Sequence, residues 1–294
     1  MINGIVNVYK ESGFTSFDVV AKMRGIFHQK KIGHTGTLDP DAQGVLPVCL
    51  GRATKVCDLL TDKDKEYEAV MLLGMTTDTQ DVSGTVLNRQ KVTVTEDAVK
   101  TVITSFEGEY MQIPPMYSAL KVNGQKLCDL ARKGIEVERK ARSVTIHKIQ
   151  ILEINLPRVR MKVECSKGTY IRTLCQDIGK KLGCGACMES LLRTRVSEFR
   201  LDGALRLQQI EELVQREDFS FVQSVDSVFM QYDSAQVMEI AKKMVENGNR
   251  IPEEMICNMC QEKEQKCIRL YDWENRFIGL YAYMPQEQDF KPIK

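Results

Sequence analysis

This chain of 294 residues has little net charge, few histidines and no long apolar runs. Its formal charge is +1, and it contains three histidines. About 18 consecutive apolar residues occur nowhere, and no basic segment followed by a long apolar run opens the sequence. These absences predict a cytoplasmic protein without a membrane partner. Internal repeats, low-complexity tracts and long linkers are also missing, and the 43% hydrophobic content allows one large domain, alone or with a small one.

The low net charge hides an uneven distribution of charge along the chain. Residues 1–200 hold 30 Lys and Arg against 23 Asp and Glu, whereas residues 201–294 hold 11 against 17. The basic excess is densest at 121–150 and 158–200. Such clustering is typical of a face that binds phosphate groups. The alternative is an ordinary solvated surface.

Ten cysteines are present, and in an intracellular chain they are expected to be mostly reduced, small apolar residues. Cys184 with Cys187, and Cys257 with Cys260, have the two-residue gap of a zinc site. The pairs lie far apart, on either side of a change in sequence character near Tyr232, and spacing alone often gives false matches. We therefore predict no metal site.

Residues 33–55 are the most informative stretch of the sequence. Four glycines and two prolines punctuate it, and it contains His34 and a carboxylate, Asp39, directly before Pro40. A proline restricts the preceding residue to extended conformations, so Asp39 is expected to project from a stiff loop. A rigid loop that leads into an apolar segment suits a catalytic carboxylate. The alternative is a structural turn capped by Asp39.

Periodicity places this loop among regular elements. Residues 4–9 alternate as a strand does, and Thr15 with Asp18 forms a capping-box signature for a helix that ends near Phe27. Other expected elements are a helix near 53–60, strands at 66–73, 142–153 and 158–165, a helix from about Thr169, a helix at 234–247 and a hairpin at 267–283. We expect an α+β fold with a mixed, largely antiparallel sheet and flanking helices.

The sequence Gly33-His34-Thr35-Gly36-Thr37-Leu38-Asp39-Pro40 resembles the catalytic motif of the bacterial tRNA pseudouridine synthase B (TruB) family. The resemblance continues along most of the chain, at 4–10, 13–16, 65–67, 77–79, 112–121, 130–134, 142–144, 165–172 and 191–195. It implies a pseudouridine-synthase fold, with a catalytic domain at 1–231 and a small C-terminal β-rich, PUA-like RNA-binding domain at 232–294. The implied substrate is the T-loop uridine of tRNA, position 55, without a cofactor.

The resemblance also implies roles for individual residues. Asp39 matches the nucleophile of the family. Arg172 matches the arginine that pairs with it and would keep the pKa of Asp39 low. Tyr67 matches the active-site tyrosine, which can stack on uracil. His34 matches an RNA-contacting histidine, and Tyr170 and Leu191 match residues that line the uridine pocket. From the residues alone, Tyr67, Tyr170 and Leu191 are equally compatible with the core, and His34 with a hydrogen bond that stabilises the loop.

The tRNA T-arm is the expected partner, and we expect a monomer with no obligatory protein partner. Lys10, Lys121, Arg132, Arg142 and Lys167 are candidate RNA-backbone contacts, with plain surface positions as the alternative. The sequence departs from the family pattern at Glu11, Asp41, Gln43, Cys128 and Leu192. None of these departures removes a proposed catalytic residue.

Three competing functions are less well supported. A glycosidase needs two carboxylates that flank a bond, and Asp39 and Asp41 lie too close in sequence to face each other across a substrate. A non-catalytic RNA-binding protein does not need Asp39, Tyr67 and Arg172 together. The archaeal and eukaryotic guide-RNA-dependent relatives share the Asp loop, but Thr35 and the match at 112–144 fit the stand-alone bacterial type better.

Overall fold

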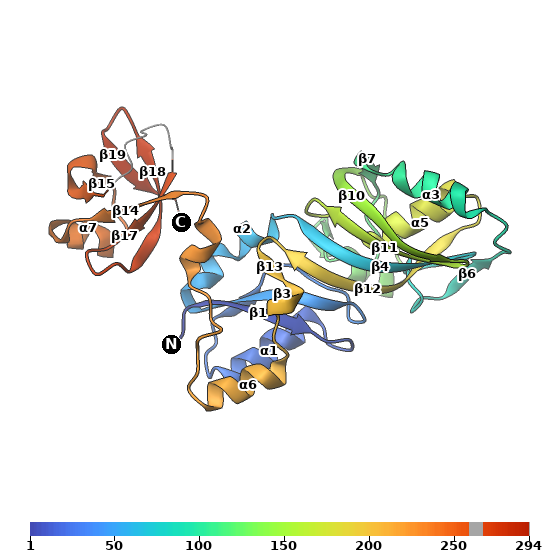
Figure 1. Cartoon of the computed structure of the whole chain (residues 1–294), viewed down its shortest axis with the longest axis horizontal. Helices are drawn as coiled ribbons and strands as arrows, with labels where there is room; N and C mark the ends of the chain where they lie inside the picture. Colours follow the sequence, from blue (N-terminus) through green and yellow to red (C-terminus); the bar gives the residue numbers. More distant parts are fainter. Residues whose placement is uncertain (259–266, 294) are drawn as a thin grey trace.

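The computed structural model describes residues 1–258 and 267–293. It is a mixed α+β structure with two large sheets, and Figure 1 shows a C-terminal β-rich domain at one end of the molecule, close to the N-terminus. The predicted fold class is confirmed. In the part of the chain that the structure describes, no helix is both long and apolar enough to cross a bilayer.

The main sheet has nine strands, in the order β1-β3-β12-β4-β11-β10-β7, with β2 paired to β3 and β13 paired to β12. All pairs are antiparallel except β3 with β12. The strands are β1 Gly4–Lys10, β2 Ile32–His34, β3 Gln43–Leu50, β4 Lys65–Leu73, β7 Gly108–Gln112, β10 Arg142–Asn155, β11 Arg158–Cys165, β12 Ala186–Val196 and β13 Phe199–Arg200.

The second sheet has six strands, in the order β15-β19-β18-β17-β14-β16. They are β14 Asp233–Val237, β15 Ile251–Pro252, β16 Ile256–Cys257, β17 Cys267–Tyr271, β18 Phe277–Met284 and β19 Asp289–Pro292. Two small hairpins stand apart from both sheets, formed by β5 Met75–Thr77 with β6 Val86–Arg89, and by β8 Lys121–Val122 with β9 Gln125–Lys126.

Helices connect the strands of both sheets. The α-helices are α1 Ser16–Ile26, α2 Cys57–Thr61, α3 Glu96–Thr104, α4 Leu127–Arg132, α5 Ile171–Lys181, α6 Leu207–Gln215 and α7 Lys242–Glu246. The 3-10 helices are η1 Gly51–Val56, η2 Leu201–Gly203, η3 Val225–Phe229, η4 Glu239–Ala241 and η5 Glu253–Met255. Of these helices, η4, α7 and η5 belong to the C-terminal β-rich domain. The capping box of α1 forms as predicted, with Thr15 and Asp18 bonded reciprocally.

Two hydrophobic clusters meet near the Asp39 loop. In one, α1 and α6 pack on β1 and β3, through residues such as Val19, Leu46 and Ile210. In the other, α3 and α5 pack on β4, β10 and β11, and this cluster includes Leu38 and Ala42 from the Asp39 loop itself. Because Leu38 packs in the second cluster while its N–H bonds to Ser16 of α1, the loop connects the two clusters.

One close backbone approach ties β3 to β12. Gly44 has φ +106°, and a Cβ atom there would lie 2.2 Å from the carbonyl oxygen of Arg193. Only glycine combines this left-handed conformation with so short a distance between strands. The contact secures the strand that follows Asp39 to the strand that carries Leu191.

The expected secondary structure is confirmed except at one place. The strands at 4–10, 65–73, 142–155 and 158–165, and the hairpin of β17 and β18, form as predicted. The helix expected at 234–247 is wrong over its first half. Residues Asp233–Val237 form β14, which pairs in parallel with β17 and buries Ala235 and Val237, so that only η4 and α7 are helical.

Candidate active site around Asp39

The loop that carries Asp39 is fixed on both sides by hydrogen bonds. On one side, the Leu38 N–H donates to the hydroxyl of Ser16 at the start of α1, at 2.9 Å. On the other side, the carbonyl of Pro40 accepts from the Gly13 N–H at 3.1 Å. Asp39 therefore projects from a loop that is anchored to the end of β1 and the start of α1.

Lys10 is the internal anchor of this loop. Its side chain is fully buried, and its ammonium donates to the carbonyls of Glu11 at 3.0 Å, Pro40 at 2.8 Å and Ala42 at 2.5 Å. Burial lowers the pKa of Lys10 to about 8, while the Asp39 carboxylate opposes that shift. The structure thus places Lys10 inside the protein, not at the surface position expected for a phosphate contact, because three loop carbonyls need its donors.

Asp39 and Arg172 form the expected pair. Arg172 lies in the first turn of α5, and its Nη2 donates to Asp39 Oδ1 at 3.1 Å while its Nε lies 2.9 Å from Oδ2. The guanidinium also donates to the carbonyls of Thr79, at 2.9 Å, and Tyr117, at 2.7 Å. Arg172 is 4% exposed, whereas the side chain of Asp39 is 38% exposed. The arginine is therefore fixed, and it orients a carboxylate that remains open on one side.

A second carboxylate, Asp81, faces the same arginine. Its Oδ2 lies 3.9 Å from Arg172 Nε, and its Oδ1 accepts from Thr79 and Ser83 hydroxyls. Burial raises the pKa of Asp39 above its usual range, and Asp81 adds to this rise, while Arg172 opposes it. The predicted pairing with Arg172 is confirmed. The predicted low pKa of Asp39 is wrong, because the rise in pKa that burial causes is larger than the decrease that Arg172 causes.

Tyr67 lies on β4 beside a buried arginine. It is directly opposite Arg193 of β12 in the sheet, and Arg193 is 1% exposed. The Arg193 guanidinium interacts with the Tyr67 hydroxyl, and its Nε donates to the Val45 carbonyl at 2.7 Å. Burial raises the pKa of Tyr67 to about 12, and the Asp39 carboxylate adds to the rise. The hydroxyl therefore stays protonated at neutral pH and can donate a hydrogen bond.

Tyr170 and Leu191 lie in the same neighbourhood. Burial raises the pKa of Tyr170, and the Asp39 carboxylate adds to the rise while the Arg172 guanidinium opposes it. Leu191 pairs with Ala69 on the strand that carries Tyr67 and packs against the same cluster as Leu38. The half-buried Tyr170 and Leu191 thus flank the Asp39 loop with Tyr67.

His34 closes β2 at the beginning of the Asp39 loop. Its Nδ1 accepts from the Gly36 N–H at 3.3 Å, so the loop-stabilising hydrogen bond considered from the sequence is present. Burial lowers the pKa of His34, and Arg193 lowers it further. A neutral imidazole with Nδ1 occupied leaves Nε2 as its free donor.

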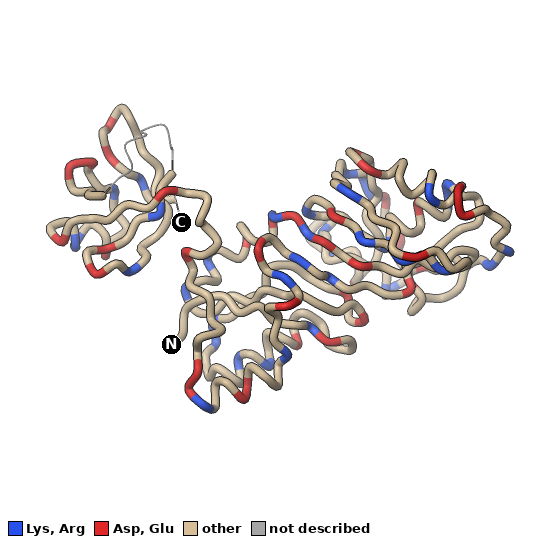
Figure 2. The backbone as a smooth tube through the Cα atoms, viewed as in Figure 1, with Lys and Arg blue, Asp and Glu red and all other residues tan. Residues whose placement is uncertain are grey.

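The remaining basic candidates lie at the surface. Lys121 and Arg142 are exposed, Arg132 is exposed and pairs with Asp129 at 3.5 Å, and Lys167 is exposed and lies 2.8 Å from Asp62. Surface ion pairs of this kind are weak and exchange readily for other anions. Figure 2 shows how Lys and Arg are distributed along the chain.

The cysteine pairs differ in what the structure describes. Cys184 and Cys187 are buried free thiols at the turn after α5 and in β12, and burial raises the pKa of Cys187 to about 11. Cys260, the second member of the other pair, lies outside the described residues. Within 1–258 and 267–293, no group of three or more His, Cys, Asp or Glu side chains is arranged to hold a metal ion.

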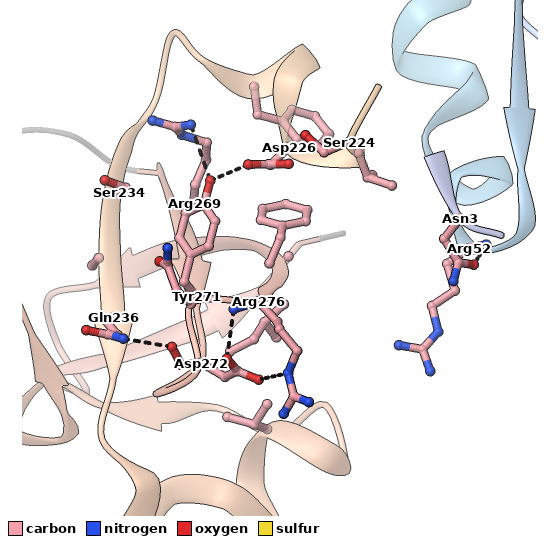
Figure 3. A pocket seen from close by; sticks show the side chains of 18 of the residues that line it. Asn3, Arg52, Ser224, Asp226, Ser234, Gln236, Arg269, Tyr271, Asp272 and Arg276 are labelled. Atoms are coloured by element: carbon pink, nitrogen blue, oxygen red, sulfur yellow. Dashed lines mark hydrogen bonds and ion pairs between the residues drawn. The ribbon is translucent and has the colours of Figure 1, made fainter. Parts of the chain in front are cut away.

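A cavity of about 1440 Å³ lies away from Asp39, between the N-terminal part and the C-terminal β-rich domain. Arg52 reaches toward it from η1, and Arg269, Tyr271 and Arg276 line it from the other side (Figure 3). Tyr271 donates to Asp226 at 2.6 Å, and Arg276 pairs with Asp272 at 2.8 Å. The walls of the cavity thus carry cations from both parts of the chain, beside apolar side chains such as Phe229 and Phe277.

The sequence did not single out every residue that shapes the site. Asp81, Arg193 and Gln112 were not chosen as functional, although Arg193 and Gln112 lie in segments that carry the resemblance. Asp81 follows Asp78 in a short polar segment, and of the two carboxylates only Asp78 lies in a segment that carries the resemblance. Only the folded chain shows that Asp81 faces Arg172 and that Asp78 instead accepts from the Thr85 N–H at 2.7 Å.

Known proteins are similar to this chain along its whole length. Residues 24–171 match the family model "TruB family pseudouridylate synthase (N terminal domain)", and residues 172–235 match "tRNA pseudouridylate synthase B C-terminal domain". The chain is 54% identical, over all of its length and 99% of the relative's, to tRNA pseudouridine synthase B of Lachnoclostridium phytofermentans. It is 45% identical to the Clostridium acetobutylicum protein of that name, with 100% and 99% of the two chains covered.

Chains from two solved assemblies are also similar to this chain. A chain in the Cbf5-Nop10-Gar1 complex matches with a TM-score of 0.73 and 27% identity, over 99% of this chain and 84% of that one. A chain of an H/ACA RNP bound to a substrate RNA containing 2'-deoxyuridine matches with a TM-score of 0.71 and 25% identity, at the same coverage. The overall fold of this chain is thus one that also occurs in an RNP bound to a substrate RNA.

Proposed function

This chain belongs to the TruB family of pseudouridylate synthases, and we propose that it converts the T-loop uridine of tRNA, position 55, to pseudouridine with Asp39 as the nucleophile. The family makes it a pseudouridine synthase, which is an isomerase that modifies tRNA. The position of the uridine and the role of Asp39 are the finer parts of the proposal. The observation that carries them is the partly open Asp39 carboxylate held by the buried Arg172.

The reaction needs what this pair offers. The C1′–N1 bond of the nucleotide must break, the uracil must turn, and C1′ must bond to C5, so that one proton leaves C5 and one is gained at N1. No group is donated and nothing is oxidised, which is why we propose no cofactor. An ionised carboxylate close to the sugar and base can act as nucleophile, and Arg172 keeps its two oxygens oriented.

The neighbouring side chains fit the binding of a displaced base. We assign to Tyr67 stacking on the uracil and donation from its protonated hydroxyl, and to Tyr170 and Leu191 the walls of the uridine pocket. His34, whose Nε2 is its free donor, contacts the RNA beside the loop. The uridine must leave its stack to reach Asp39, at a cost of a few kcal/mol that stacking and backbone contacts offset.

We assign the RNA backbone to the exposed basic residues of the catalytic part, Lys121, Arg132, Arg142 and Lys167. We also propose the division into a catalytic domain at 1–231 and an RNA-contacting domain at 232–294. The strands of the main sheet end at Arg200 and those of the second sheet begin at Asp233, which supports this division. Arg52 and Arg276 lie on the walls of the cavity between the two domains, and we expect them to contact RNA phosphates there (Figure 3).

The protein is proposed to act as a monomer in the cytoplasm, without a guide RNA or an obligatory protein partner. Its bacterial relatives named tRNA pseudouridine synthase B align over 94–99% of their own length, whereas the similar chains of the H/ACA RNP and of the Cbf5-Nop10-Gar1 complex are covered over 84% of theirs. Activity of the purified chain alone is therefore the direct expectation.

The decisive experiment incubates the purified chain with an unmodified tRNA transcript and maps pseudouridine at single-nucleotide resolution. We expect one modified site, the uridine at position 55. A transcript in which that uridine is replaced by cytidine serves as the control and should remain unmodified. If the well-folded protein binds tRNA but forms no pseudouridine, the chain is an RNA-binding protein and the enzymatic proposal is wrong.

Removal of one basic side chain should weaken tRNA binding in a salt-dependent way. For Arg142→Ala we expect a lower affinity, and a slope of log K against log salt that is shallower by about 0.7 to 0.9, because one phosphate contact and its released counterion are lost. Arg216→Ala removes an equally exposed arginine from the acidic C-terminal third and is the matched control. If the two variants had equal slopes of log K against log salt, Arg142 would not be a phosphate contact.

A further inference from the structure

Gln112 is a buried polar residue for which the chemistry above has no role. It is the last residue of β7, an edge strand of the main sheet, and it is 1% exposed. A buried amide needs partners for its carbonyl oxygen and its N–H groups, because an unpaired one is costly. Its partners therefore show what the side chain does.

The Gln112 amide forms a closed ring with the backbone of a single residue, Tyr170. Its Oε1 accepts from the Tyr170 N–H at 2.8 Å, and its Nε2 donates to the Tyr170 carbonyl at 3.1 Å. The same Nε2 also contacts the hydroxyl of Tyr110 two residues earlier on β7. The two bonds to Tyr170 imitate the paired bonds between neighbouring strands, although 58 residues separate the partners in sequence.

Tyr170 is the residue at which α5 begins. It is the N-cap, and its carbonyl accepts the first helical bond, from the Leu174 N–H at 3.0 Å. A tyrosine has no short side-chain acceptor of the kind that usually caps a helix, and the N–H groups of the first turn have no partner within the helix. Gln112 supplies an acceptor for one of them from a different strand.

The structure assigns to Gln112 a positioning role in pseudouridine formation: its amide fixes the N-cap residue of α5, and thereby the positions of Tyr170 and Arg172 relative to Asp39. Arg172 is only two residues beyond Tyr170, and its guanidinium must meet Asp39, Thr79 and Tyr117 together. A displaced helix start cannot satisfy all three. This inference rests on the proposed function, because the rate it predicts is that of the reaction at Asp39.

The test compares two glutamines that make the same ring. Gln29 accepts from the Ile2 N–H at 3.0 Å and donates to the Ile2 carbonyl at 3.1 Å, beyond the end of α1. Gln112→Met and Gln29→Met each remove such a pair of hydrogen bonds and keep similar side-chain volumes, and Gln112→Met also removes the contact with the Tyr110 hydroxyl. We expect Gln112→Met to lower kcat about 10- to 100-fold with KM within about 3-fold of wild type, since small misplacement of reacting groups is enough for such losses. Gln29→Met should keep the wild-type kcat.

A double-variant comparison separates positioning from general loss of stability. In an Arg172→Lys background, Gln112→Met should lower kcat by a much smaller factor than in the wild type, because the geometry it protects is already lost. An undiminished factor in that background would show that Gln112 acts independently of Arg172 and would overturn the inference. If Gln112→Met does not fold, Gln112→Glu takes its place, since its carboxylate can accept from the Tyr170 N–H but cannot donate to the Tyr170 carbonyl.

Hydrogen exchange tests the inference without any reaction. The amides of residues 170–174 should exchange faster in Gln112→Met than in the wild type and in Gln29→Met. Unchanged exchange there, or equal kcat for the two glutamine variants, would overturn the positioning role. A wild type that shows the expected exchange pattern but forms no pseudouridine would instead disprove the proposed function.

Discussion

Asp39→Asn should abolish pseudouridine formation, with a loss of about 10⁴-fold or more in the single-turnover rate, while tRNA still binds. The amide has the size of the carboxylate and can still accept from Arg172 at the position of Oδ1, where the bond is 3.1 Å long. What disappears is the negative charge and the nucleophilic oxygen. Rapid-mixing assays with labelled tRNA measure the rate, and a filter-binding titration measures the affinity.

The stability of this variant should change little, which separates a chemical loss from a folding defect. Burial raises the pKa of Asp39, so the ionised form is less favourable in the folded protein than in the unfolded chain at neutral pH. A neutral amide removes that unfavourable term but sets its –NH2 against the Nε–H of the buried Arg172, so the two effects oppose each other and we expect a Tm close to that of the wild type.

Asp41→Asn is the matched control, since Asp41 is an exposed carboxylate two residues further along the same loop. It should keep the wild-type rate. Product formed by Asp39→Asn, with deamidation excluded by mass spectrometry of the protein, would disprove the assignment of the nucleophile. A large loss in Asp41→Asn would instead show that the loop carries two functional carboxylates.

The sequence predicted the parts of this site that depend on local pattern. Alternation along 65–73 placed Tyr67 on the buried face of β4, and the Thr15–Asp18 box placed the start of α1, to which the loop is anchored. Both depend on residues a few positions apart. The pairing of Asp39 with Arg172, which are 133 residues apart, came only from the family resemblance.

The parts that the sequence could not predict depend on tertiary contacts. Lys10 ends a strand, where a lysine is usually exposed, and only the folded loop brings three carbonyls to its ammonium. The direction of the Asp39 pKa shift depends on how much water the fold removes from the carboxylate. At 237–245 the spacing of Val237, Ala241 and Val245 is helical, but β17 offers an edge to which residues 233–236 pair instead.

Removing the charge of Arg172 should both slow the reaction and move its pH dependence. Arg172→Met loses the bonds to Asp39, Thr79 and Tyr117, and we expect the rate to fall about 10²- to 10³-fold. Since the reaction needs ionised Asp39, activity is lost as pH falls through the pKa of that carboxyl. Arg172 lowers this pKa, so its removal raises it, and the acid limb of the pH–rate profile should move to higher pH.

Two further variants test whether the acid limb of the pH–rate profile reports the pKa of Asp39. Asp81→Asn removes a negative charge that raises the pKa of Asp39, so its acid limb should move to lower pH, opposite to Arg172→Met. Arg172→Lys keeps the cation but loses the forked geometry, so its rate should fall while its acid limb stays near that of the wild type. If the acid limbs of Arg172→Met and Asp81→Asn moved in the same direction, the acid limb would report a group other than Asp39. The loss of a nearby cation and the loss of a nearby anion must shift the pKa of one carboxyl in opposite directions.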